Sequence, residues 1–137
     1  TALLPEGPSD ELLDCRPAAV ACFSGLYDTH PKKGVAADKF LDSQEAQEFS
    51  PMRWVRKGLV PLFMTHGKKD RLLPHAQAKR FYKRYKRKRN AVEWIDFHGA
   101  EHSFYNFNVS EQHFEITLDA FDAFLVRQGF LEPDVVV

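Results

Sequence analysis

Two short polar turns carry residue types that could perform acid–base chemistry together. One turn reads HGKKD at residues 66–70, and the other reads GAEHSF at residues 99–104. A carboxylate that accepts a hydrogen bond from an imidazole orients the ring and stabilises its charged form. Asp70 and His102 are therefore candidates for the acid and the base of a Ser-His-Asp triad, provided that the fold brings the two turns together.

Three short apolar runs could place these turns. Residues 16–24, 60–65 and 91–97 read as strands of a parallel sheet, the first of them buried on both faces. The second run is expected to stop at His66-Gly67 and the third at His98-Gly99. Each polar turn therefore follows a strand, and the carboxyl ends of parallel strands are where functional groups gather.

Helical spacing accounts for most of the remaining chain. Between the second and third strands, residues 74–89 place Ala78, Phe81, Tyr82 and Tyr85 on one helical face. A strand–helix–strand connection makes the flanking strands parallel. Residues 29–50 read as a loop with a short helix.

A last helix is expected after residue 110, with Ser110 as its cap and Gly129 at its end. Phe114, Leu118, Phe121 and Leu125 form one stripe that should cover a sheet face. The expected fold class is α/β, the C-terminal part of a doubly wound, mainly parallel sheet with three strands and flanking helices. Residues 1–137 then form a single partial domain, and further strands are expected before Thr1 because parallel sheets seldom leave such an edge unpaired.

The two turns resemble those in the C-terminal half of α/β-hydrolase superfamily domains. The likeness includes Ser50-Pro51 before the turns and Leu73-Pro74 between them. The likeness covers roughly residues 16–131. It is closest to acetylxylan and feruloyl esterase-like and dienelactone hydrolase-like esterases, and more distant to prolyl oligopeptidase catalytic domains. The resemblance implies that Asp70 is the triad acid and His102 the base of a serine-type carboxylic-ester hydrolase that works through an acyl-enzyme.

The sequence departs from that family at the nucleophile. No G-x-S-x-G elbow occurs in the chain, and Ser24-Gly25 lacks the preceding glycine. We therefore do not expect Ser24 to be the nucleophile. The serine is expected on an N-terminal half of the same domain outside this chain, and the 137 residues alone are expected to be inactive.

Plainer roles exist for several of these residues. Asp70 could cap the turn into the following helix, and His102 could be a structural histidine. Asp28, after the first strand, is a rival acid, and His66 is expected to fix its turn by hydrogen bonding. His98 and His102 have H-x-x-x-H spacing, but no third ligand is apparent, so neither a metal nor another cofactor is expected.

Charge and hydropathy limit the partners. The 19 basic and 19 acidic residues balance, so no global field attracts nucleic acid. Residues 79–89 hold eight basic residues among aromatic ones, which fits an amphipathic helix with a solvated basic face better than a nucleic-acid stripe. No apolar stretch reaches the ~20 residues of a membrane span.

The expected partner is a small-molecule or carbohydrate-linked ester, with no nucleic acid and no membrane. Two other functions remain open from the residues. One is a serine peptidase of the prolyl oligopeptidase type, and the other is a non-catalytic binding module of the same fold. The sequence does not indicate a compartment.

Overall fold

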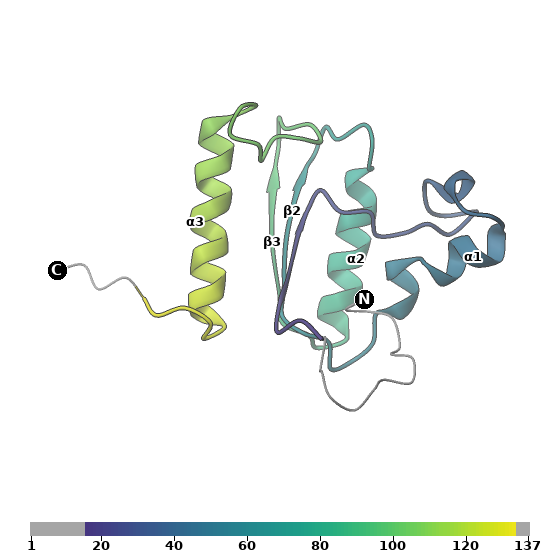
Figure 1. Ribbon diagram of the computed structural model, residues 1–137, viewed down its shortest axis with the longest axis horizontal. Helices are drawn as coiled ribbons and strands as arrows, with labels where there is room; N and C mark the ends of the chain where they lie inside the picture. Colours follow the sequence, from purple (N-terminus) through teal and green to yellow (C-terminus); the bar gives the residue numbers. More distant parts are fainter. Residues whose placement is uncertain (1–15, 134–137) are drawn as a thin grey trace.

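Three parallel strands lie between helices in the computed structural model, which describes residues 16–133 (Figure 1). The strands are β1 (Val20–Phe23), β2 (Leu62–Gly67) and β3 (Val92–Phe97), in the spatial order β1-β2-β3. The helices are η1 (Ala37–Lys39), α1 (Ser43–Glu48), η2 (Pro51–Trp54), α2 (His75–Arg87) and α3 (Glu111–Arg127). The expected strands, their parallel pairing and the short helix within residues 29–50 are confirmed.

The central strand β2 fixes the register of the sheet. Leu62 pairs with Val20 on one side and with Val92 on the other, and every residue of β2 is buried. The strand was expected to end before His66, but His66 and Gly67 continue the ladder opposite Asp96 and Phe97. His66 is therefore a strand residue in the interior, and only the segment from Lys68 onward forms the turn.

Strand β1 is less buried than the sequence predicted. Its residues are partly exposed, and Phe23 retains 36% of its surface. Within residues 16–133 it pairs with β2 alone, so its outer edge has no strand against it. An apolar composition could not distinguish such an edge from the middle of a sheet.

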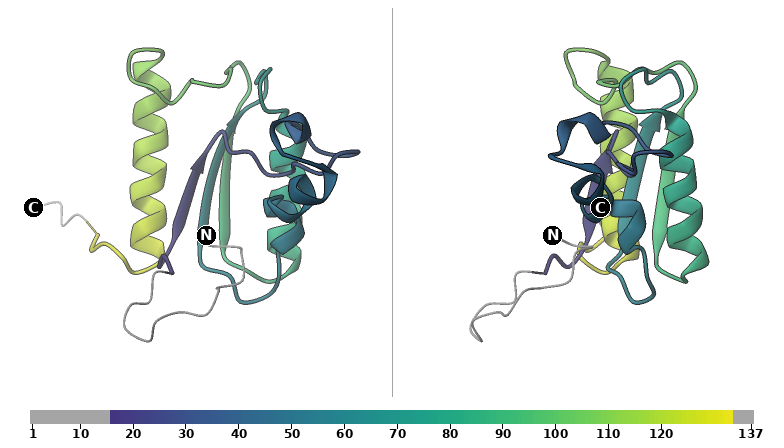
Figure 2. Two further views of the ribbon diagram at one scale, coloured as in Figure 1. Left: turned by 45° about the vertical axis from the view of Figure 1, so that its right-hand side comes forward. Right: turned by 90° about the vertical axis from the view of Figure 1, so that its right-hand side faces the viewer.

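Helix α2 covers one face of the sheet (Figure 2). Its buried face presents Ala78, Phe81 and Tyr85 to a core that includes Leu62 and Met64. The Tyr85 hydroxyl donates to the carbonyl of Val60 at 2.5 Å and so ties the helix to the residues before β2. Hydrophobic burial thus fixes this helix, and its basic residues are left on the outer face.

Helix α3 covers the other face, as expected (Figure 2). The Ser110 hydroxyl accepts the backbone N–H of His113 at 3.3 Å and caps the first turn. Phe121 and Phe124 pack on Phe63 of β2, with ring centroids 5.3 and 5.7 Å away. The predicted stripe is only partly buried, and Leu118 remains exposed. None of the helices within residues 16–133 has the length and apolarity needed to cross a membrane.

Candidate active site

The turns after β2 and β3 touch each other through their backbones. Lys69 N–H donates to the carbonyl of Ala100 at 2.9 Å, and Lys68 N–H donates to that of Phe97 at 2.9 Å. A Cβ atom on Gly67 would lie 2.3 Å from the Ala100 carbonyl oxygen, so only glycine permits this approach. Gly67, the last residue of β2, therefore allows the two turns to meet.

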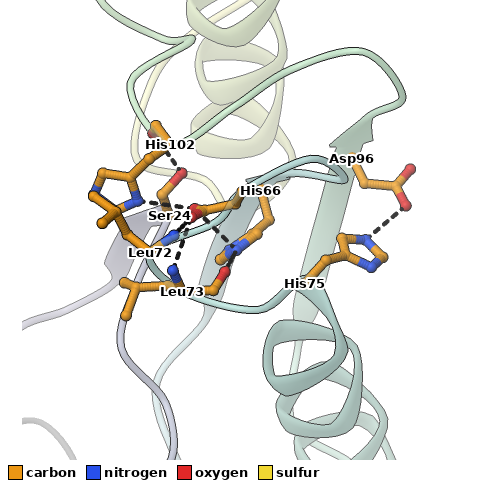
Figure 3. A network of polar contacts seen from close by, with 8 residues as sticks. Ser24, His66, Leu72, Leu73, His75, Asp96 and His102 are labelled. Atoms are coloured by element: carbon orange, nitrogen blue, oxygen red, sulfur yellow. Dashed lines mark hydrogen bonds and ion pairs between the residues drawn. The ribbon is translucent and has the colours of Figure 1, made fainter. Parts of the chain in front are cut away.

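This contact brings the predicted acid and base together (Figure 3). His102 Nδ1 lies 2.8 Å from Asp70 Oδ2, which is hydrogen-bonding distance. The Asp70 side chain is fully buried, whereas 29% of the His102 side chain is exposed. With its proton on Nδ1, the ring keeps the lone pair of Nε2, which makes no hydrogen bond to any residue from 16 to 133.

Asp70 also caps its own turn. Its Oδ1 atom accepts the backbone N–H groups of Leu72 and Leu73 at 2.9 and 2.8 Å. The capping role uses Oδ1 and the contact with His102 uses Oδ2, so Asp70 can fill both roles at once. The two backbone donors stabilise the charged carboxylate and fix its plane.

His66 has a larger part in this network than a turn contact alone. Its Nε2 atom lies 2.8 Å from the Leu73 carbonyl oxygen and 3.3 Å from Asp70 Oδ2. The ring is 1% exposed. The expected hydrogen bond is present, whereas nothing in the HG dipeptide indicates the contact with Asp70.

The rival acid Asp28 lies in a different network. Its carboxylate accepts hydrogen bonds from the Ser50 hydroxyl at 3.1 Å and from the backbone N–H of His30 at 3.0 Å. Arg80 approaches its other oxygen at 3.5 Å. Within the part of the chain that the structure describes, Asp28 makes no contact with His102.

Ser24 holds the backbone of the candidate base. Its hydroxyl donates to the main-chain carbonyl of His102 at 3.0 Å, not to the imidazole ring. The residue is buried and has a left-handed backbone with φ of 49°. Nothing in the spacing of the sequence could have indicated this contact, which joins residues from two separate loops.

The two histidines with H-x-x-x-H spacing face different partners. His98 Nε2 lies 2.8 Å from Lys68 Nζ, whereas His102 is bonded to Asp70. Near His98, Asp96 pairs with His75 at 3.1 Å and with Lys68 at 3.5 Å. Residues 16–133 contain no group of three or more histidine, cysteine or acidic side chains placed to hold a metal ion.

A hollow of about 430 Å³ opens beside His102. It lies between the turns after β2 and β3 and the start of α3. It is lined by Arg71, Leu72, Gly99, Ala100, Glu101, His102, Ser103, Phe104, Val109, Ser110 and His113. Phe104 is buried and packs on Phe97 with ring centroids 4.7 Å apart, whereas Phe107 is exposed and does not line the hollow. The site therefore combines a half-exposed imidazole with space for a small molecular group.

Comparisons with known proteins add an independent finding. The sequence matches the prolyl oligopeptidase family over residues 24–127. The fold is similar to solved structures of a thermophilic esterase from the Planctomycetes species Thermogutta terrifontis. No curated protein matches the sequence.

Three of these esterase structures show the extent of the likeness. The propionate-bound form is 28% identical, with a TM-score of 0.82, over 96% of this chain and 52% of its own. The native form is 27% identical, with a TM-score of 0.83, over 97% and 51%. The form phosphorylated by paraoxon is 26% identical, with a TM-score of 0.80, over 96% and 49%. The chain thus spans about half the length of the esterases that it matches.

Proposed function

The chain belongs to the prolyl oligopeptidase family of α/β-hydrolases, and from that premise we propose that it supplies the acid and base of a serine-type carboxylic-ester hydrolase. Membership confirms the resemblance to the α/β-hydrolase superfamily drawn from the two turns and places the chain among serine hydrolases. The observation that carries the proposal is the 2.8 Å contact between His102 Nδ1 and the buried Asp70 carboxylate. In this proposal Asp70 is the acid and His102 the base.

The contact gives each group a step in ester hydrolysis. His102 Nε2 takes the proton of a serine hydroxyl while the serine oxygen attacks the ester carbonyl. The imidazolium that forms is stabilised by Asp70, and it returns the proton to the departing alcohol. Water then attacks the acyl-enzyme with His102 again as base, which releases the carboxylic acid and restores the serine.

We assign the serine and the oxyanion donors to an N-terminal half of the same domain. Three observations support this assignment. The sequence holds no G-x-S-x-G elbow, and Ser24 directs its hydroxyl to a backbone carbonyl. In addition, the outer edge of β1 has no strand against it within residues 16–133, and an N-terminal half could supply one.

The proposed substrate is a small-molecule or carbohydrate-linked ester. The similar esterase has been solved with propionate and with butyrate, and phosphorylated by paraoxon. The hollow beside His102 has room for a short acyl or alcohol group. The family match also favours a second candidate, a serine peptidase of the prolyl oligopeptidase type, since the same acid and base serve amide hydrolysis.

We propose no nucleic-acid partner for the basic face of α2, and no membrane partner. Single-stranded nucleic acids bind through aromatic side chains on which bases can stack. The aromatic residues of α2 are not available for this, because Phe81 and Tyr85 are buried and Tyr82 packs on Trp94. The basic residues are then a solvated face.

The two enzymatic candidates differ in the bond that is hydrolysed, which is an ester in one case and a peptide bond in the other. We expect a hybrid, in which this chain follows the N-terminal half of the Thermogutta terrifontis esterase, to hydrolyse p-nitrophenyl acetate and butyrate. A peptide p-nitroanilide with proline before the scissile bond should be cleaved far more slowly, as measured by kcat/KM for both substrate classes. A higher kcat/KM for the peptide would reject the ester hydrolase in favour of the peptidase.

A further inference from the structure

We propose that His66 is a positioning residue, which holds the Asp70 carboxylate against His102 by donating its Nε2–H to the Leu73 carbonyl while the same nitrogen lies 3.3 Å from Asp70 Oδ2. This inference rests on the proposed function. His66 touches no substrate and acts on the site only through Asp70. Figure 3 shows the His66 ring beside Leu73, in the same polar network as His102.

The contacts of the ring determine its tautomer. The carbonyl of Leu73 can only accept a hydrogen bond, so the 2.8 Å contact requires a proton on Nε2 of His66. The same nitrogen lies 3.3 Å from Asp70 Oδ2, so its N–H group is close to the carboxylate as well as to the carbonyl that accepts it. Nδ1 is buried without a hydrogen-bond partner among the described residues, where a second proton would be unsatisfied.

The surroundings keep this ring neutral. Burial lowers the pKa of His66, and the nearby rings of His75 and His102 act in the same direction. The Leu73 carbonyl and the Asp70 charge oppose this shift but are weaker than burial. At neutral pH His66 is therefore an uncharged donor, which can orient Asp70 without competing as a second cation for its charge.

The ring acts on Asp70 by two routes. One is the direct approach of Nε2 to within 3.3 Å of Oδ2, the oxygen that His102 also contacts at 2.8 Å. The other passes through Leu73, whose carbonyl accepts from His66 and whose N–H donates to Asp70 Oδ1 at 2.8 Å. His66 therefore fixes both the carboxylate and the loop that caps it, so its loss should loosen the contact with His102.

A first test uses the unchanged chain. Nitrogen-15 spectra of its histidine rings should show His66 as a neutral ring with the proton on Nε2, and His102 with a hydrogen-bonded proton on Nδ1 at low field. A His66 ring with its proton on Nδ1 could not donate to the Leu73 carbonyl, and that result would overturn the proposal. This measurement needs no variant and does not depend on how well a variant folds.

A second test removes the donor and then restores one. His66→Leu fills a similar volume without a donor, whereas His66→Gln retains an N–H that can reach the same acceptors. In His66→Leu the low-field Nδ1 proton of His102 should broaden and move upfield, toward its behaviour in Asp70→Asn. In His66→Gln it should stay close to that of the unchanged chain.

The outcomes separate this inference from the function on which it rests. If Asp70→Asn abolishes the His102 signal and His66→Leu leaves it unchanged, His66 is only a packing residue and the inference is wrong. If Asp70→Asn also leaves the signal unchanged, the acid–base pair itself fails, and the proposed function fails with it. If His66→Leu does not fold, the signal of His66→Gln and the tautomer of the unchanged chain decide.

Discussion

Replacing Asp70 by Asn in the hybrid with the Thermogutta terrifontis N-terminal half is expected to lower kcat for p-nitrophenyl acetate about 10⁴-fold. The amide nitrogen of Asn can replace the oxygen that faces His102 Nδ1, and a ring beside that donor adopts the wrong tautomer. Asn also lacks the charge that stabilises the imidazolium. Steady-state kinetics of the folded variant, with its fold checked by circular dichroism, provide the measurement.

Asp28→Asn is the matched control for this substitution. Asp28 is buried like Asp70 and accepts hydrogen bonds from a hydroxyl and a backbone N–H, but it does not contact His102. We expect kcat of the Asp28 variant to stay close to that of the unchanged hybrid. A large loss on Asp28→Asn together with a small one on Asp70→Asn would transfer the role of the acid to Asp28.

Gly67→Ala is expected to destabilise the chain by about 1–3 kcal/mol and to separate the two turns of the site. The new Cβ would lie 2.3 Å from the Ala100 carbonyl oxygen and 2.6 Å from that of Glu101. Both are backbone atoms, so relief requires the loop that carries His102 to move away from β2. Urea unfolding measures the change in the free energy of unfolding.

Gly99→Ala is the control that distinguishes the clash at Gly67 from a general effect of adding a methyl group. Gly99 lies in the turn that leads to His102, and a Cβ there would meet no atom within 4 Å. We expect its free energy of unfolding to change by less than about 0.5 kcal/mol. Equal destabilisation by the two substitutions would show that the approach at Gly67 is not what joins the turns.

Local patterns predicted most of the framework that positions the site. The three apolar runs became β1, β2 and β3, and the aromatic spacing of residues 74–89 became α2. The helix between β2 and β3 predicted their parallel pairing. This pairing places Asp70 and His102 at the same end of the sheet, after the carboxyl ends of the two strands. These features depend on hydrophobic periodicity and chain connectivity, which a single sequence records directly.

The details that escaped prediction depend on contacts between distant segments. Strand β2 continues through His66 because β3 offers partners there, and nothing local to the HG dipeptide shows this. The hydrogen bond from Ser24 to the His102 carbonyl joins two loops in the same way. The exposure of Phe23 depends on what lies beyond the edge of β1, which no pattern within residues 16–24 encodes.

The structure was also needed to decide between the two interpretations of Asp70. From sequence, a turn cap and a triad acid are alternatives, because either role suits an Asp between a strand and a helix. The side chain divides its oxygens, one toward the backbone of Leu72 and Leu73 and the other toward His102. The cap therefore helps to orient the acid, and the two roles are compatible.

In the proposed mechanism this chain carries the base and the acid, while the nucleophile comes from elsewhere. The most direct test measures p-nitrophenyl acetate turnover by the 137-residue chain, by the hybrid, and by the His102→Ala variant of each. We predict that the chain alone is no faster than its variant, and that the hybrid shows saturable turnover that His102→Ala abolishes. Saturable turnover by the chain alone, lost in its His102→Ala variant, would contradict the claim by placing the nucleophile within these residues.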